Sequence, residues 1–160
     1  MTSLPNLVKK KIDPRCLAKG KVKKEGCAVK MTNISAQMLV TDLDRPGSPL
    51  RPDEKRCDYL LLATDEQADE QPKDLVVALE LKRGKLDARK VVSQLQAGAH
   101  AAEKLVPKSR VVRFRPVAVF GTSHRHERIE LRKPENEIAF HGHRESVQML
   151  SCGNSLTKVP

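Results

Sequence analysis

The sequence predicts an α/β protein with a mixed central β-sheet, made of a β-meander, a β-α-β crossover and short terminal β-strands. Three apolar segments with polar or proline-containing connections precede one long amphipathic segment, and a further apolar segment follows it. A strand, a helix and a strand in this order place the two strands in parallel. Short polar connections instead favour antiparallel neighbours. We therefore expect both kinds of pairing in one sheet.

The strands of the meander are expected in the first half of the chain. Residues 35–43 and 57–64 are apolar segments of strand length. Between them, 44–56 contains three prolines and one glycine, which indicates a loop. The polar segment 65–74 fits a hairpin connection to a third strand over 75–82.

The crossover follows the third strand, which we expect to end at Gly84. Apolar residues recur at helical spacing over 86–106, and Pro107 provides the stop. Residues 115–121 form a compact apolar run, which predicts a buried strand. Four short elements are also expected: a helix over 22–31, and strands over 128–132, 137–141 and 146–150, with a turn at 134–136 between the first two strands.

The chain length of 160 residues suits a single domain with one hydrophobic core. We expect that domain to include all of 1–160, with a basic N-terminal extension over 1–34 and a C-terminal β segment over 122–160. The aromatic content is only 2%. The core is therefore aliphatic, and base stacking on a broad aromatic platform is not expected.

The formal charge of +10 is concentrated in clusters, which favours a polyanionic partner. We expect nucleic acid, and DNA in particular, although a basic surface that only aids solubility would look the same. The candidate contacts are Lys9, Lys10, Lys11, Lys21, Lys23 and Lys24 near the N-terminus, and His124, Arg125, His126 and Arg128 after the last long strand. A homodimer or a place in a larger complex is also compatible with the sequence.

No segment approaches the ~20 apolar residues of a membrane span. The N-terminus is basic but has no continuous apolar stretch, so it does not resemble a secretory signal. We expect a cytoplasmic protein with no membrane partner. Cys16, Cys27, Cys57 and Cys152 form no C-x-x-C pair, and reduced thiols are the simplest interpretation.

Charged residues interrupt the third strand at its inner end. Glu80 and Lys82 alternate with Leu81, so both side chains point to the same side. Asp58 opens the preceding strand, and an antiparallel hairpin would bring it beside them. Two carboxylates repel each other unless a cation lies between them. Oxygen ligands of this kind, with the Leu81 carbonyl as a third, suit Mg²⁺ or Mn²⁺.

The pattern D58…E80-L81-K82, followed by a helix and a strand, resembles the PD-(D/E)XK nuclease superfamily, which has the restriction-endonuclease-like fold. The resemblance covers roughly residues 36–121. It implies a metal-dependent nuclease in which Asp58 and Glu80 bind the metal. The resemblance also implies that Lys82 acts on the attacking water.

Some members of that superfamily place a glutamine on the following helix. Gln94 is the candidate here, with Gln96 as the less favoured choice. A tyrosine found four residues later in some subgroups would stand at Gly98 and is absent. Many members have an additional acid on an N-terminal helix, for which Glu25 is a candidate. The residue before Asp58 is Cys57, where the motif often has proline.

Three other interpretations remain open from the sequence. The Glu80–Lys82 pair could be an ordinary surface ion pair on an edge strand. The protein could be a non-catalytic nucleic-acid-binding or accessory module that keeps the fold. The H-R-H at 124–126 and the H-G-H at 141–143, with Cys152, could hold zinc, although their spacing matches no standard finger. Asp42 and Asp44 could join the acidic site, but they are expected to end the first strand beside the proline-containing loop.

Overall fold

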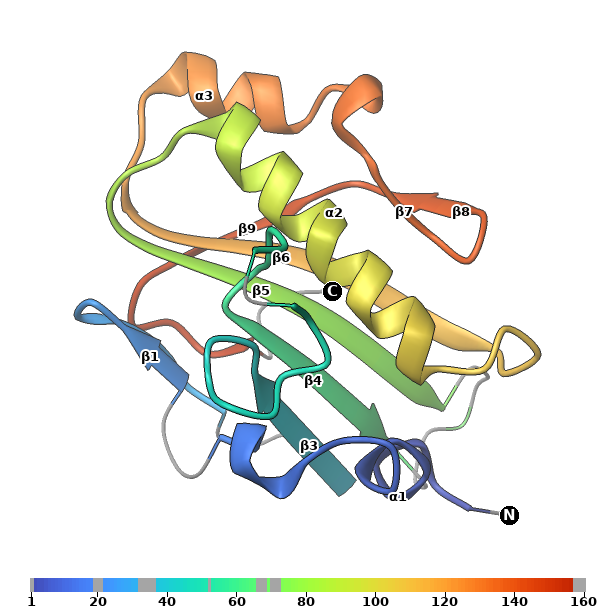
Figure 1. Cartoon of the computed structure of the whole chain (residues 1–160). Helices are drawn as coiled ribbons and strands as arrows, with labels where there is room; N and C mark the ends of the chain where they lie inside the picture. The colour runs from blue at the N-terminus through green and yellow to red at the C-terminus, as the bar shows by residue number, and fades with distance from the viewer. Residues whose placement is uncertain are drawn as a thin grey trace.

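A mixed five-stranded sheet forms the centre of the computed structural model, which describes residues 2–18, 22–31, 37–51, 53–65, 69 and 73–156 (Figure 1). The strand order is β3-β4-β5-β6-β9. Strands β3, β4 and β5 are antiparallel neighbours, whereas β5, β6 and β9 are parallel. This confirms the predicted α/β class with a mixed sheet. The bounds are β3 (Gln37–Asp42), β4 (Tyr59–Thr64), β5 (Asp74–Lys85), β6 (Val112–Thr122) and β9 (Gln148–Ser151).

The long helix α2 (Ala88–Leu105) connects β5 to β6 and covers one face of the sheet (Figure 1). The Asp87 side chain accepts a hydrogen bond from the Lys90 amide and caps the N-terminus. The buried positions of α2 recur at helical spacing, as the sequence predicts. No described helix combines the length and the apolar character needed to cross a membrane.

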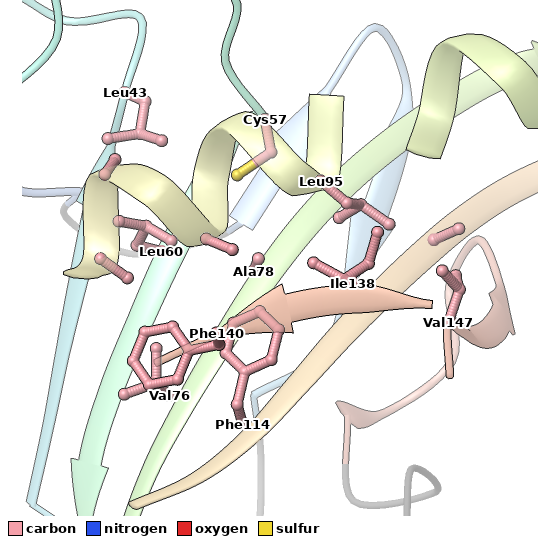
Figure 2. Close-up of a cluster of buried hydrophobic side chains, with 14 of the residues drawn as sticks. Leu43, Cys57, Leu60, Val76, Ala78, Leu95, Phe114, Ile138, Phe140 and Val147 are labelled. Carbon is pink, nitrogen blue, oxygen red and sulfur yellow. The ribbon is translucent and has the colours of Figure 1, made fainter. Parts of the chain in front are cut away.

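The main core lies between α2 and the sheet (Figure 2). Aliphatic side chains of β4 and β5 meet the buried face of α2 there. The rings of Phe114 and Phe140 stack with their centroids 4.7 Å apart. Phe140 belongs to a hairpin formed by β7 (Ile138–Phe140) and β8 (His143–Glu145), which packs against α2. The predicted strand over 137–141 is confirmed by β7, and the one over 146–150 by β9.

The expected helix over 22–31 is wrong, because this segment is a β-hairpin on the other face of the sheet. Strands β1 (Val22–Lys24) and β2 (Cys27–Val29) pair antiparallel. Glu25 and Gly26 form the turn with φ angles of 48° and 82°. Two consecutive positive φ angles match the tight turns of two-residue hairpin loops, and glycine makes the second inexpensive.

The expected strand over 128–132 is also wrong. The chain forms helix α3 (Arg125–Leu131), followed by the short 3₁₀ turn η2 (Pro134–Asn136). The Glu127 carboxylate accepts a hydrogen bond from the Ala88 amide at 2.7 Å and so ties α3 to the start of α2. Leu131 is buried, whereas Ile129 is 49% exposed. A strand with one buried face would bury both of these alternate residues, and here only one of them is buried.

Gly84 does not end the third strand as expected. Strand β5 continues to Lys85, and its pairing with β6 shifts in register between Lys82 and Lys85. A side chain at Gly84 would meet nothing within 4 Å. The glycine therefore marks an irregularity in the ladder, which is a common role for glycine inside a strand.

Two of the four cysteines form a disulfide, Cys27–Cys152, which corrects the expectation that all are reduced thiols. The bond joins the β1–β2 hairpin to the residues after β9. Backbone hydrogen bonds reinforce this junction, from Gly153 N to Ala28 O and from Leu156 N to Lys30 O. Cys16 and Cys57 are free and buried. Scattered spacing in the sequence carries no signal for pairing across 125 positions.

The N-terminal residues form a helix that the sequence did not predict. Helix α1 (Leu4–Lys9) is capped by Ser3, with Pro5 in its first turn, and the 3₁₀ turn η1 (Pro14–Cys16) follows. The Leu4 amide donates a hydrogen bond to Thr64 Oγ1 at 3.1 Å. Because Thr64 is the last residue of β4, α1 lies at the opposite end of this strand from Asp58 (Figure 1).

Removing the disulfide should destabilise the protein. Cys27→Ser/Cys152→Ser should lower the free energy of unfolding by about 2–4 kcal/mol, because the bond closes a long loop in the unfolded chain. Urea unfolding with and without dithiothreitol measures the effect. Reductant should bring the wild type to the stability of the double variant and leave the variant unchanged. Equal stability of both proteins without reductant would contradict the prediction.

Candidate active site

Asp58 is held at the junction of β4 and β5. Its amide donates to the Leu79 carbonyl at 3.0 Å, and its carboxylate Oδ2 accepts from the Leu81 amide at 2.8 Å. The antiparallel pairing of β4 with β5 is confirmed, with Tyr59 opposite Leu79. The side chain therefore bridges to the strand that carries the E-L-K triplet. In an extended strand the N–H and C=O of one residue face the same neighbour, so the Leu81 carbonyl lies on this side too.

Glu80 is the buried member of the cluster. Its side chain is 1% exposed, and its Oε2 lies 2.9 Å from the Lys82 Nζ. Glu80 Oε1 is buried and has no hydrogen-bond partner among the residues that the structure describes. Strand alternation places Glu80 on the same face of β5 as Ala78, which packs under α2. A buried, unsatisfied carboxylate oxygen is costly, which distinguishes this residue from an ordinary surface ion pair.

The two carboxylates repel each other, and the pKa values of the cluster reflect this repulsion. Burial and then the charge of Asp58 raise the pKa of Glu80 to about 7, although the Lys82 ammonium opposes this shift. Burial also raises the pKa of Asp58, against the hydrogen bond from the Leu81 amide. Burial alone would lower the pKa of Lys82, but Glu80 and Asp58 outweigh it and the pKa is raised. One ammonium is therefore insufficient to neutralise both acids.

Gln94 lies on the buried side of α2, one helical turn before Gly98. A Cβ at Gly98 would overlap the Cys57 Sγ and approach the Ala78 Cβ to 3.5 Å. Since α2 runs back along β5, one turn of helix corresponds to two residues of strand, and Gln94 faces the Glu80 end of β5. Gln94 Oε1 is also buried and finds no hydrogen-bond partner in the described part of the chain. The contact with Cys57 also leaves no room for a tyrosine at Gly98.

Gln96 has a different role from Gln94. Its side-chain amide donates to the Ala139 carbonyl at 2.9 Å and accepts from the Ala139 amide at 3.0 Å. These two bonds hold β7 against α2. Gln96 is thus engaged with β7, whereas the Gln94 side-chain oxygen is not engaged with any described residue.

A cation would find a small oxygen site here. Within the described part of the chain, no group of three or more His, Cys, Asp or Glu side chains could hold a metal. The available ligands are Asp58, Glu80 and the Leu81 carbonyl. Mg²⁺ is commonly bound by one or two carboxylates with waters completing the shell. The partnerless Glu80 Oε1 and the repulsion with Asp58 fit such an ion.

Two acids and a lysine border this cluster, although the sequence assigned them elsewhere: Asp42 and Asp44 to the end of the first strand, and Lys24 to the contacts with nucleic acid. Lys24 Nζ lies 3.1 Å from Asp42 Oδ1 and 3.3 Å from Asp44 Oδ2. Asp42 ends β3 as expected, and its bond to the Asp44 amide forms the start of the loop. The charge of Asp44 contributes to the raised pKa of both Asp58 and Glu80. No sequence signal links residue 24 to residues 42 and 44, because the hairpin turn sets that contact.

The predicted N-terminal contacts with nucleic acid are spread over separate places. Lys9, Lys10 and Lys11 belong to α1 or follow it, at the end of the sheet away from Asp58. Lys11 Nζ donates to the Leu105 carbonyl at 3.0 Å and so caps the end of α2. Lys23 is exposed on the β1–β2 hairpin, while Lys21 lies outside the described residues.

The hairpin brings Lys24 and Glu25 close to the charged cluster. Lys24 forms the ion pairs described above, and its Nζ lies 5.2 Å from the centroid of the Tyr59 ring. Glu25 occupies a turn and not the helix expected of an additional acid. Its charge is nevertheless among those that favour the protonated form of Lys82 and raise the pKa of that side chain, after Glu80 and Asp58.

The second predicted contact region lies beside the start of α2. His124 is the N-cap of α3, and Arg125, His126 and Arg128 follow in the helix, next to the start of α2. The rings of His124 and His126 stack with centroids 5.6 Å apart. Arg128 Nη1 is bound to the Ser123 hydroxyl at 2.7 Å. The zinc interpretation loses its thiol ligand, because Cys152 is bonded to Cys27.

No protein-family model, curated protein or solved structure matches this chain. The candidate site therefore depends on the geometry of its own residues.

Replacing Gly98 tests how α2 is seated over β4 and β5. Gly98→Ala should lower the free energy of unfolding by about 1–3 kcal/mol, because the new methyl group overlaps the Cys57 sulfur. Cys57→Ala in the same chain should recover part of that loss by removing the sulfur. Denaturant unfolding of the four proteins gives the double-mutant cycle. Strictly additive costs would contradict this contact.

Glu80 should make stability depend on pH. Its pKa in the folded protein, about 7, lies above the ordinary 4.5, so the folded state binds this proton more tightly than the unfolded chain. The free energy of unfolding should fall as pH rises between these values, by up to about 3 kcal/mol. Chemical unfolding at about pH 5 and about pH 8 measures it. Glu80→Gln should be less sensitive to pH; the same sensitivity in both proteins would rule out a raised pKa.

Proposed function

We propose that this protein is a Mg²⁺- or Mn²⁺-dependent nuclease with a restriction-endonuclease-like fold, which hydrolyses phosphodiester bonds of DNA. The observation that carries the proposal is Glu80. It is a buried carboxylate beside a second carboxylate, with one oxygen bound to Lys82 and the other without a hydrogen-bond partner among the described residues. A purely structural ion pair would not need the second acid, whose charge makes burial of Glu80 more costly.

Asp58, Glu80 and the Leu81 carbonyl would hold the divalent cation. Asp58 is oriented for this by the Leu81 amide, and Glu80 by the Lys82 ammonium. When bound, such an ion stabilises negative charge on phosphate oxygens and lowers the pKa of a bound water. Metal binding would also relieve the repulsion between the two carboxylates.

Lys82 would act as a positioned cation. Its raised pKa keeps the Nζ protonated at neutral pH, so the ammonium donates hydrogen bonds and does not serve as a base. With Glu80 Oε2 holding one of its protons, the others can orient the attacking water and stabilise charge on the phosphate. The Gln94 amide, on the facing helix, would position the same water or a phosphate oxygen.

The arrangement of the strands supports the proposed fold. The E-L-K triplet is on β5, which is the last strand of the antiparallel meander and the central strand of the sheet, and the helix after it crosses to a parallel strand. The sequence resemblance implies the same order. A protein that keeps this fold as a non-catalytic binding module is the alternative that the experiments below separate.

The direct test is a panel of nucleic acids. Supercoiled plasmid, linear duplex, single-stranded DNA and RNA are incubated with Mn²⁺, with Mg²⁺ and with EDTA. The proposal expects metal-dependent cleavage of at least one DNA form. Binding without cleavage in both metals, together with no shift of the melting temperature by either metal, would favour the non-catalytic alternative.

Variants of the cluster should differ in the step that they affect. Asp58→Ala should weaken metal binding and abolish cleavage, because a ligand is lost. Lys82→Ala should still bind metal and DNA but cleave about 10²-fold or more slowly, as expected when a charge-stabilising group is lost. Metal-dependent melting curves and single-turnover cleavage measure the two effects. Gln96→Ala, whose side chain is bound to β7, is the matched control for Gln94→Ala.

A further inference from the structure

A cleft opens beside the charged cluster, between the loop 44–56 and the first half of α2. Its volume is about 670 Å³. Asp44 and Gln94, which border the cluster, both line it. The loop contributes Lys55 and Arg56, and α2 contributes Arg89, Lys90 and Ser93. The cleft therefore leads from solvent toward the candidate active site.

A second hollow of about 530 Å³ continues the cleft along α2. The two share Lys55, Arg89 and Ser93, so they form one groove. The second hollow extends past His100 to Arg144 of β8. Arg89 and His100 are 11 positions apart, which is about 16 Å of helix. A duplex strand has a phosphate every ~3.4 Å along its axis, so the groove can follow several phosphates.

The acids of the cleft are already engaged. Asp44 is paired with Lys24 at 3.3 Å, and Glu54 with Arg51 at 2.9 Å. Asp87 accepts a hydrogen bond from the Lys90 amide as the cap of α2. These contacts reduce the negative charge that the first hollow presents to a polyanion. In the second hollow, Glu137 is paired with Arg144 at 3.8 Å, and Glu135 also lines the wall.

Arg56 donates to the Leu43 and Arg51 carbonyls, but three other cations of the groove remain available. Lys55, Arg89 and Lys90 are exposed, and none of them forms an ion pair with a described residue. Lys55 Nζ donates a hydrogen bond to the Ser93 hydroxyl at 3.2 Å. Uncommitted cations on two walls of a groove are typical of contacts to a phosphate backbone.

We propose that this groove binds the phosphate backbone of the DNA strand that is cut, with Lys55, Arg89 and Lys90 as its phosphate contacts. The inference rests on the proposed nuclease function and names the path by which its substrate reaches the site. It replaces the lysines of α1 as the principal contacts. It also makes the substrate a polymer that extends along α2 beyond the scissile phosphate, and not a short fragment.

The test measures binding separately from cleavage. Fluorescence anisotropy follows labelled DNA of about 4 and about 20 nucleotides, single-stranded and duplex, with EDTA and with Ca²⁺. Arg89→Ala/Lys90→Ala should weaken binding of the long DNA about tenfold or more and reduce the slope of log K against log salt by about 2. Lys9→Ala/Lys10→Ala removes the same charge from exposed lysines of α1 and should change the affinity less than threefold.

The groove proposal would be overturned if the two double variants lost the same DNA affinity, or if the wild type bound short and long DNA with equal affinity. Lys55→Ala, in the loop, repeats the test if the helix variant fails to fold; an affinity within twofold of the wild type would then reject the proposal. Tighter binding of RNA than of DNA would reject the substrate class. If DNA binds through the groove but is not cleaved, the nuclease proposal is rejected and the groove proposal stands. If DNA is cleaved equally well after the groove cations are removed, the groove proposal is rejected and the nuclease proposal stands.

Discussion

The hydrogen bond from the Leu81 amide to Asp58 Oδ2 is the contact on which the candidate site depends. It joins the start of β4 to the charged end of β5, so that two carboxylates and one ammonium converge where the strands end. The cost is a buried Glu80 whose pKa is raised to about 7. The fold tolerates this because Lys82 binds one oxygen of Glu80, and because the surrounding core is well packed.

The periphery of the site is assembled from both ends of the chain. The β1–β2 hairpin crosses the far face of the sheet and delivers Lys24 to Asp42 and Asp44. The disulfide Cys27–Cys152 fixes the base of that hairpin to the residues after β9. Segments far apart in sequence thus set the electrostatic environment of Asp58. Burial raises the pKa of Asp58, and the charge of Lys24 opposes that shift.

The cations of this structure differ in whether they are engaged within the protein or available to a polyanion. Lys11 caps a helix, and Lys24 neutralises two acids. Arg89 and Lys90, on the exposed side of α2, form no ion pair with a described residue and line the cleft that leads to the cluster. Net charge predicts attraction to a polyanion in general, but only the position of each cation relative to a groove selects those able to bind one.

The sequence by itself determined the meander, the crossover helix and the convergence of Asp58 with Glu80 and Lys82, because these follow from local apolar patterning and one short hairpin. It did not determine the hairpin over 22–31, helix α3 or the disulfide. The Glu25–Gly26 turn is a weak local signal, and α3 forms where Glu127 can cap the start of α2. Such long-range contacts decide short segments, since a few residues have too little intrinsic preference to choose between helix and strand.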